Sequence, residues 1–484
     1  MRFATVALLL AVMAPPALLI AAGQRPAGPP DNASTTFRAG AATSTITPPL
    51  GSSLNGGFQD RKAAHVHDDL HARCLVLDDG TTRLAFAVCD SCMIPREVVD
   101  EAKRQIAEHA GIPPQNVLVS ATHTHTAPTA TGVFQSDPDP AYLKFLAARI
   151  ADGVRRAANN LAPARIGWGA GKQPDHVFNR RWKMKPGTIP PDPFGNTTDR
   201  VQMNPPAGSA NLLEPAGPTD PDVWVVSVRT PEGKPLAVLA NYALHYVGGN
   251  PGDHVSADYY GMFAAALAQK LGANDAAQDP PFVAILSNGA SGNINNVNFR
   301  VRPDALPPYG RMRVVADSVA AEAARLCGSI QYHDHATLAA RTAPLELAVR
   351  KPSAADLARA KEILAPLAGK VLRSAPEVYA RETVLLNDYP EKVELTLQAL
   401  RVGDLTIVAA PCEVFVEIGM ELKQKSPRKP LFLISLANGY NGYLPTPEHH
   451  QLGGYETWRA RSSYLEVDAS TKIVAKLLEF VSGL

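Results

Sequence analysis

The chain has 484 residues, of which 45% are hydrophobic and 19% charged, a composition that is ordinary for a globular protein and excludes wholesale disorder. Because 47 Lys and Arg residues nearly balance 46 Asp and Glu residues and no basic run stands out, nucleic acid is excluded as the expected partner. The length allows one large domain or two moderate ones.

The first residues predict an exported protein. Arg2 precedes an apolar run that ends in small residues at 21–23, which predicts a signal peptide over residues 1–22. Pro15 and Pro16 argue against a stable spanning helix, although an uncleaved anchor remains the alternative. Residues 23–36 predict a proline-rich tether. We therefore expect a secreted or periplasmic protein, with an N-terminal anchor or peripheral membrane contact as the alternative.

Strand-like and helix-like segments then alternate. The pattern predicts a strand over 82–90, a helix from Pro95 to Gly111, a strand over 117–121 and a helix over 142–158. This alternation predicts an α/β fold with a mixed β-sheet core flanked by helices. Cys89 and Cys92 have C-x-x-C spacing, but no helix begins at the first cysteine, so buried thiols or a disulfide are favoured over a redox pair.

His123 and His125 follow the predicted strand over 117–121. Alternation in an extended chain would place them on the same side, about 7 Å apart. One imidazole could then bind a cation while the other reaches a substrate, and imidazole is a preferred ligand of zinc. Two surface histidines that bind nothing would give the same local pattern.

Residues 186–221 contain nine prolines and separate Arg180 from a predicted strand over 223–228. A structureless segment of this length inside a compact domain is usually functional, so we expect an ordered loop that forms a lid or a cleft wall. A linker between domains is the alternative.

The second half repeats the alternation, with further predicted strands and helices. The strands cover 236–243, 282–287, 393–400, 405–410 and 431–436, and the helices cover 257–271, a segment ending near 326, 354–368 and a segment from about 469. Strand ends deliver His123 with His125, then His245, Glu413 and Tyr443. Because ligand sites of open α/β sheets gather outside strand ends, these side chains are predicted to share one site.

Ordered motifs add a family resemblance. They are Thr122-His123-Thr124-His125, Asn179-Arg180, Asn241-Tyr242-Ala243-Leu244-His245 with Asp258 and Gly261, Gly292-Asn293-Ile294-Asn295, Pro411-Cys412-Glu413 and Asn438-Gly439-Tyr440-Asn441-Gly442-Tyr443. In this order, from about Phe37 to Asp468, the chain resembles the neutral/alkaline non-lysosomal ceramidase family. The resemblance implies a single ceramidase-like catalytic domain over 37–484.

The same resemblance implies a role for each site residue. The expected zinc ligands are His123, His245, Glu413 and Tyr443. His125 is expected to face the substrate, where it stabilises an oxyanion or moves a proton, and Arg180 to contact the developing negative charge. Tyr455 resembles another site tyrosine, and Gly57 is expected to offer a backbone N–H to the substrate.

Two departures from the family pattern concern the substrate. Asn295 stands where the family has a serine, and an amide cannot act as a nucleophile. The family continues into an immunoglobulin-like domain, whereas a helix from about Ala469 is the last element predicted before Leu484. Both departures leave the ligand set intact and argue against ceramide itself.

The sequence therefore predicts an exported zinc-dependent hydrolase that cleaves an amide bond of a small-molecule or lipid-like substrate by metal-activated water. His125 and Arg180 would stabilise the oxyanion, and Asn295 would orient water or substrate. An ester or a polar sugar-derived substrate is the alternative, because the proline-rich segment carries Asp192, Asn196 and Asp199. A non-catalytic binding protein on the same scaffold is the other alternative.

Overall fold

The structure is a computed structural model and describes Met1, residues 36–275 and residues 277–484. Apart from their end residues, the predicted signal peptide and tether lie outside the described residues. Residues 36–484 cluster as one unit by their internal contacts. No helix in the described ranges is both long and apolar enough to cross a membrane.

Three sheets of four or five strands organise this unit. In spatial order, the first contains β7 (Val117–Ala121), β6 (Arg83–Cys89), β5 (His71–Asp78), β1 (Arg38–Thr45) and β8 (Ala162–Pro163). The second contains β17 (Val283–Asn288), β15 (Pro235–Tyr242), β14 (Asp222–Arg229) and β9 (Arg165–Lys172). The third contains β19 (Leu338–Ala348), β20 (Lys392–Val402), β21 (Leu405–Ala409) and β23 (Leu431–Ile434).

Each of these sheets contains one parallel pair whose crossover includes a helix. The units are β6–α1–β7, β15–α3–β17 and β21–α7–β23, with α1 at Arg96–Ala110, α3 at Asp258–Lys270 and α7 at Val416–Lys425. Parallel strands require such a crossover, and their carboxyl ends share one sheet edge. Three sheet edges are therefore available to carry functional side chains.

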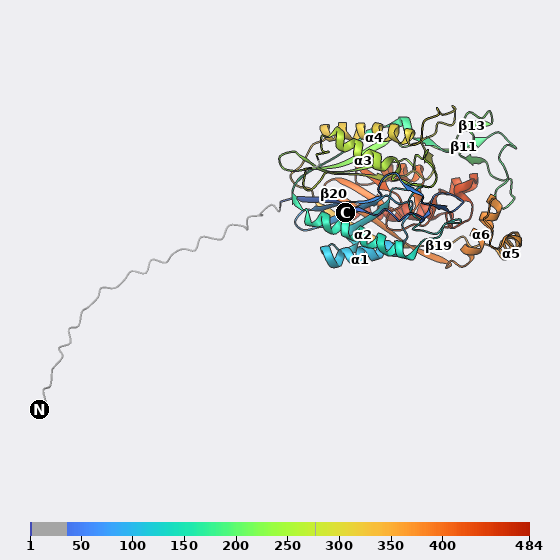
Figure 1. The fold of residues 1–484 in the computed structure, drawn as a ribbon, viewed down its shortest axis with the longest axis horizontal. Helices are drawn as coiled ribbons and strands as arrows, with labels where there is room; N and C mark the ends of the chain where they lie inside the picture. Colours follow the sequence, from blue (N-terminus) through green and yellow to red (C-terminus); the bar gives the residue numbers. More distant parts are fainter. Residues whose placement is uncertain (2–35, 276) are drawn as a thin grey trace. The chain divides into compact units, whose positions relative to one another are not determined.

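The period-2 pattern of the strands explains the layers. In β6, Leu84, Phe86 and Val88 enter a core that also contains residues of the other two sheets, whereas Ala85 and Ala87 face a separate cluster with α1 and α2 (Pro140–Asn159). The outer face of the second sheet packs on α3 and α4 (Gly310–Ser329), and that of the third on α7 and α9 (Ala469–Ser482). Figure 1 shows the α1–α2 and α3–α4 pairs on separate faces.

Backbone hydrogen bonds join the carboxyl ends of the three parallel pairs. The Ala121 N–H donates to the Leu436 carbonyl at 3.1 Å, and the Ser435 N–H donates to the Asn288 carbonyl at 2.9 Å. The segment after β23 thus contacts the ends of β7 and β17. This junction brings residues more than 300 positions apart into one place.

The predicted α/β class is confirmed, and each predicted strand and helix has a counterpart in the structure. Several elements were not predicted, including β1, β5, β9, β19 and α6 (Ala375–Asn387). The segment 186–221 is not a loop throughout, which corrects the expectation. Its strands β12 (Val201–Met203) and β13 (Leu212–Pro215) pair on either side of β11 (Arg181–Met184).

Candidate metal centre and active site

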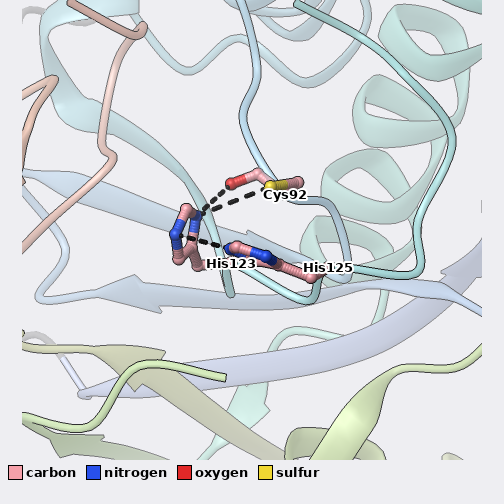
Figure 2. Close-up of side chains that lie close together, drawn as sticks. All are labelled: Cys92, His123 and His125. Carbon is pink, nitrogen blue, oxygen red and sulfur yellow. Dashed lines mark hydrogen bonds between the residues drawn. The ribbon is translucent and has the colours of Figure 1, made fainter. Parts of the chain in front are cut away.

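The histidine pair does not continue the strand that precedes it. β7 ends at Ala121, and His123 has φ +77°, so the chain leaves the extended conformation before His125. The Nε2 atoms of His123 and His125 are 3.1 Å apart, and the two rings meet edge to face. The expectation that the two histidines lie in an extended chain was therefore wrong. Figure 2 shows the His123 and His125 rings in contact through their nitrogen atoms, beside Cys92.

Three imidazoles converge in the same way. His123 Nδ1 donates to the Cys92 carbonyl at 2.8 Å, His125 Nδ1 to the Gly56 carbonyl at 2.9 Å, and His245 Nδ1 to the Ser291 carbonyl at 3.2 Å. Because carbonyls only accept, each Nδ1 carries a proton, and Nε2 is the atom of each ring that is directed into the cluster. His123 Nε2 lies 3.0 Å from His245 Nε2. Imidazole nitrogens that converge in this way are typical ligands of a metal ion.

Glu413 completes this arrangement. Its Oε2 atom lies 3.2 Å from His123 Nε2 and 3.8 Å from His245 Nε2, and it accepts no hydrogen bond within the described chain. Oε1 accepts a hydrogen bond from the Tyr440 hydroxyl at 2.9 Å. A buried carboxylate oxygen without a partner is unfavourable unless a cation lies against it. The ligand atoms of His123, His245 and Glu413 all lie within 4.8 Å of one another, so this set fits a metal ion.

Tyr443 reaches the same place through strand pairing. β22 (Glu413–Val414) and β24 (Tyr443–Leu444) are parallel, and Glu413 is the register partner of Tyr443. Both residues line a cavity of about 40 Å³ together with His123 and His125. Burial and the nearby Glu413 carboxylate raise the pKa of the Tyr443 phenol, whereas Arg180 opposes this shift.

Arg180 is held beside Tyr443 by a buried ionic network. The Nη2 atom of Arg180 donates to the Gly292 carbonyl at 2.8 Å and to the Tyr443 hydroxyl at 3.2 Å. Nε donates to Glu456 Oε1 at 3.1 Å, while Arg181 Nη1 donates to Glu456 Oε2 at 2.7 Å. Glu456 was not predicted, although it directly follows the predicted site residue Tyr455 in the chain. One carboxylate thus positions two buried guanidinium groups.

Tyr455 and Gly57 also line the small cavity, so the structure brings both predicted residues to the histidine cluster. The Tyr455 ring centroid is 5.9 Å from that of Tyr443. The neighbouring Gly56 has φ +107°, and a Cβ atom there would lie 2.5 Å from the His125 side chain. Only glycine combines this backbone conformation with such a close approach.

Asn295 is placed elsewhere. It belongs to β18 (Ile294–Asn295), which pairs with β10 (Phe178–Asn179). Its side-chain amide donates to Asn204 Oδ1 at 2.7 Å, and its Oδ1 accepts from the Val297 N–H at 2.9 Å. Asn295 is absent from the cavity lining. Within the described ranges, one of its side-chain hydrogen bonds goes to the proline-rich segment and the other to its own loop. The structure therefore does not join Asn295 to the cluster.

Sequence reasoning missed several neighbours of the cluster. Tyr440 lies in the predicted Asn438–Tyr443 loop, but nothing local indicated that it binds Glu413. Tyr246 stacks on His125 with ring centroids 3.7 Å apart, and Arg61 donates to the His125 carbonyl at 2.8 Å. Cys89 and Cys92 are buried free thiols. Cys92 contacts the cluster through its carbonyl and through Sγ, which lies 3.7 Å from His123 Nδ1.

Electrostatics keep two of the rings neutral. Burial lowers the pKa of His125, and the neighbouring His123 lowers it further. Burial likewise lowers the pKa of His245, with Arg180 as the next cause. Both groups therefore offer the unprotonated Nε2 that metal binding requires.

Comparison with known proteins agrees with this architecture. The family model described as neutral/alkaline non-lysosomal ceramidase, N-terminal, matches residues 37–300. Neutral ceramidase from Mycobacterium tuberculosis is 27% identical over 269 residues, which cover 52% of this chain and 39% of that protein. Neutral ceramidase A from Dictyostelium discoideum is 23% identical over 274 residues, covering 53% and 34%. The matched region thus spans well under half the length of these relatives.

Solved structures show the same fold. Neutral ceramidase from Pseudomonas aeruginosa superposes with a TM-score of 0.69 at 19% identity, covering 92% of this chain and 74% of that one. A structure described as ceramidase complexed with C2 gives a TM-score of 0.68 at 17% identity, covering 92% and 75%. The family model matches more than half of the chain, and the three-sheet architecture agrees with it. The chain belongs to the neutral/alkaline non-lysosomal ceramidase family.

Proposed function

We propose that this protein is an exported, zinc-dependent hydrolase that cleaves an amide bond. The observation that carries the proposal is the convergence of three imidazole Nε2 atoms and an unpartnered oxygen of Glu413, with every Nδ1 hydrogen bonded to a carbonyl. Orientation of ligating histidines through Nδ1 is typical of metal sites, where such contacts fix the tautomer. The predicted signal peptide supports export.

Zinc is the ion that this ligand set favours. His123, His245, Glu413 and Tyr443 would hold it, because two imidazoles, a carboxylate and a phenolic oxygen match its preference for nitrogen and oxygen ligands. When bound, zinc supplies Lewis-acid activation of water and of a substrate carbonyl. A zinc ion held by these ligands favours hydrolysis over redox or phosphoryl-transfer chemistry.

The chain's own residues supply binding and charge stabilisation. Arg180 presents a buried guanidinium beside Tyr443, where it would stabilise negative charge on the carbonyl oxygen. His125 is less buried than His123 and lies between the small cavity and a larger pocket, so it would face the substrate. With its lone pair on Nε2, His125 could accept a proton at that atom.

An apolar pocket favours a substrate with a hydrocarbon chain. This pocket of about 300 Å³ adjoins the site at Tyr455, and its other lining residues include Phe58, Ile189, Pro190, Pro191, Val201, Met203 and Trp458. The segment 186–221 was expected to indicate a polar ligand, yet it contributes most of these apolar side chains. The pocket supports an N-acyl amide over a sugar-derived compound.

The test combines metal analysis with turnover. Freshly purified protein should contain about one zinc per chain, and it should hydrolyse long-chain N-acyl amides faster than short polar amides, esters and glycosides. His245→Ala should lose both zinc and activity, whereas His109→Ala, at an exposed position of α1, should keep both. Metal-free protein whose activity ignores chelators would contradict the proposal.

A further inference from the structure

A second, larger pocket adjoins the metal cavity on the side of His125. It has a volume of about 500 Å³ and shares Gly56, Gly57 and His125 with the small cavity. Unlike the apolar pocket, it is lined by polar and charged groups, among them Arg61, Asn250, Asp258, Tyr246 and Arg373. A substrate bound at the metal centre would therefore lie between an apolar pocket and a polar pocket.

Two arginines of this pocket form no ion pair in the part of the chain that the structure describes. Arg61 Nη2 donates to the carbonyls of His125 at 2.8 Å and Asn55 at 3.2 Å, while its Nε is buried without a hydrogen-bond partner. Close to Arg373, backbone N–H donors and the charge of Arg373 lower the pKa of Glu377, but the Arg373 side chain forms no ion pair with that carboxylate. Arg180 and Arg181, by contrast, share Glu456. The side chain of Arg373 is exposed and lines the pocket, so it is the cation that an incoming anion can reach.

Asp258 does not neutralise these cations. Its Oδ1 atom accepts from the N–H groups of Val247 and Tyr259, and its Oδ2 atom accepts from the N–H of Gly248 at 2.8 Å. The carboxylate is buried and directed at backbone donors, with φ +55° at its own residue. Two arginines against one internally satisfied aspartate leave the pocket with an excess of positive charge.

We propose that this pocket binds a carboxylate on the amine half of the substrate, so that the preferred substrates are fatty-acyl amides of amino acids. This inference rests on the proposed amide hydrolysis. Phe58 lines both the polar and the apolar pocket. His125 is shared by the polar pocket and the metal cavity, and Tyr455 is shared by the apolar pocket and that cavity. An amphiphile with an acyl chain at one end and an anionic group at the other matches this sequence of surfaces.

The reaction is an ordinary hydrolysis. A C–O bond forms between water and the acyl carbon, the C–N bond breaks with its electron pair leaving on nitrogen, and the nitrogen takes up a proton. The products are a fatty acid and a free amino acid. No oxidant, reductant or co-substrate other than water is needed.

The experiment compares N-dodecanoyl-glycine with N-dodecanoyl-glycinamide, which have similar size and differ only in whether the amine half carries a carboxylate. We expect a KM about tenfold lower for N-dodecanoyl-glycine, the effect of one charge-assisted contact, with similar kcat. Arg373→Gln should remove most of this preference, because it removes the exposed cation of the pocket. No side-chain hydrogen bond of Arg373 within the described residues is lost with it. Arg104→Gln on α1 removes an exposed arginine that contacts Glu101 and Glu108 and should retain the preference.

Binding separates this inference from the proposed function. The N-dodecylsulfonyl analogues of glycine and glycinamide cannot be hydrolysed, and calorimetry on the full chain measures their affinities directly. Tighter binding of the glycine analogue that is lost in Arg373→Gln supports the anion site. It does so even if no amide is turned over, and such a lack of turnover would contradict the proposed hydrolysis instead. Equal KM and equal affinity for both members of each pair, unchanged by Arg373→Gln, would overturn the inference and leave amide hydrolysis standing.

Discussion

The Tyr440 hydroxyl donates a 2.9 Å hydrogen bond to Oε1 of Glu413, and the other oxygen of this carboxylate lies 3.2 Å from His123 Nε2. The phenol therefore orients a carboxylate that is proposed to bind metal. Partners of this kind commonly contribute a factor of 10–100 to metal affinity. Tyr440 thus acts on the site through Glu413.

Tyr440→Phe is expected to weaken zinc binding by roughly ten- to a hundredfold while the protein stays folded. Competition with a fluorescent chelator measures this change. Tyr464→Phe is the matched control, because it removes a 2.8 Å hydrogen bond to Asn441 Oδ1 that does not involve Glu413. Equal zinc affinity in the two variants would show that Tyr440 does not position Glu413.

Gly56→Ala is expected to abolish activity, because its Cβ would lie 2.5 Å from the His125 side chain. The matched control is Gly233→Ala, where φ is +91° and no atom lies within 4 Å of the new Cβ. Both substitutions introduce backbone strain of about 1–2 kcal/mol. Thermal unfolding measures that shared effect, and turnover measures the effect on His125. If both variants retained similar activity, the close approach of Gly56 to His125 would have no functional role.

Local signals explain which parts of the fold could be predicted. Pro95 and Gly111 mark the ends of α1, and Gly111 has φ +64° as a helix terminator requires. The apolar runs of β6 and β7 were equally clear. β9 was not, because its sequence Arg165–Lys172 is rich in glycine. A Cβ at Gly167 or Gly169 would meet Gln331 or Ile330, so this strand reflects a packing demand and not a strand propensity.

The candidate site likewise has features that could be predicted from the sequence and features that could not. The motif order identified the residues that converge, including His245, Glu413 and Tyr443, which come from separate strand ends. The arrangement of His123 and His125 could not be predicted, because the positive φ of His123 accompanies a hydrogen bond from its N–H to the Ser91 carbonyl and another from Nδ1 to Cys92. Such tertiary contacts leave no periodic trace in the sequence.

Glu456→Gln is expected to lower the free energy of unfolding at pH 7 by about 3–5 kcal/mol, because two buried guanidinium groups lose their counter-charge. Burial alone would raise the pKa of Glu456, but Arg181 and Arg180 hold it below the ordinary value of 4.5. A lowered carboxyl pKa contributes stability above pH 4.5, and this stability is lost as the pH falls through the folded-state value.

Denaturant unfolding between pH 7 and pH 3 measures this dependence. The wild-type protein should lose stability over the acidic part of the range, and Glu456→Gln should lose less of it because the variant lacks the titrating group. Glu214→Gln removes an exposed, solvent-screened pair with Lys183 and should leave stability unchanged within the error of the measurement. Identical pH profiles for wild type and Glu456→Gln would show that the network does not govern acid stability.

Lys103 on α1 is only 5% exposed, and its ammonium forms no ion pair in the part of the chain that the structure describes. Burial lowers its pKa from 10.5 to about 8, with Asp100 opposing this shift. Since the folded-state pKa is depressed, stability should rise as the pH increases from about 8 to 10.5, where the unfolded chain would still bind the proton. Lys103→Met should therefore raise the free energy of unfolding at pH 7 by about 1–3 kcal/mol and flatten this rise.

Urea denaturation at pH 7 and pH 10 tests both effects, with the exposed Lys270→Met as control. A variant that is less stable than wild type at pH 7 would show that the ammonium of Lys103 is solvated or paired in the folded protein.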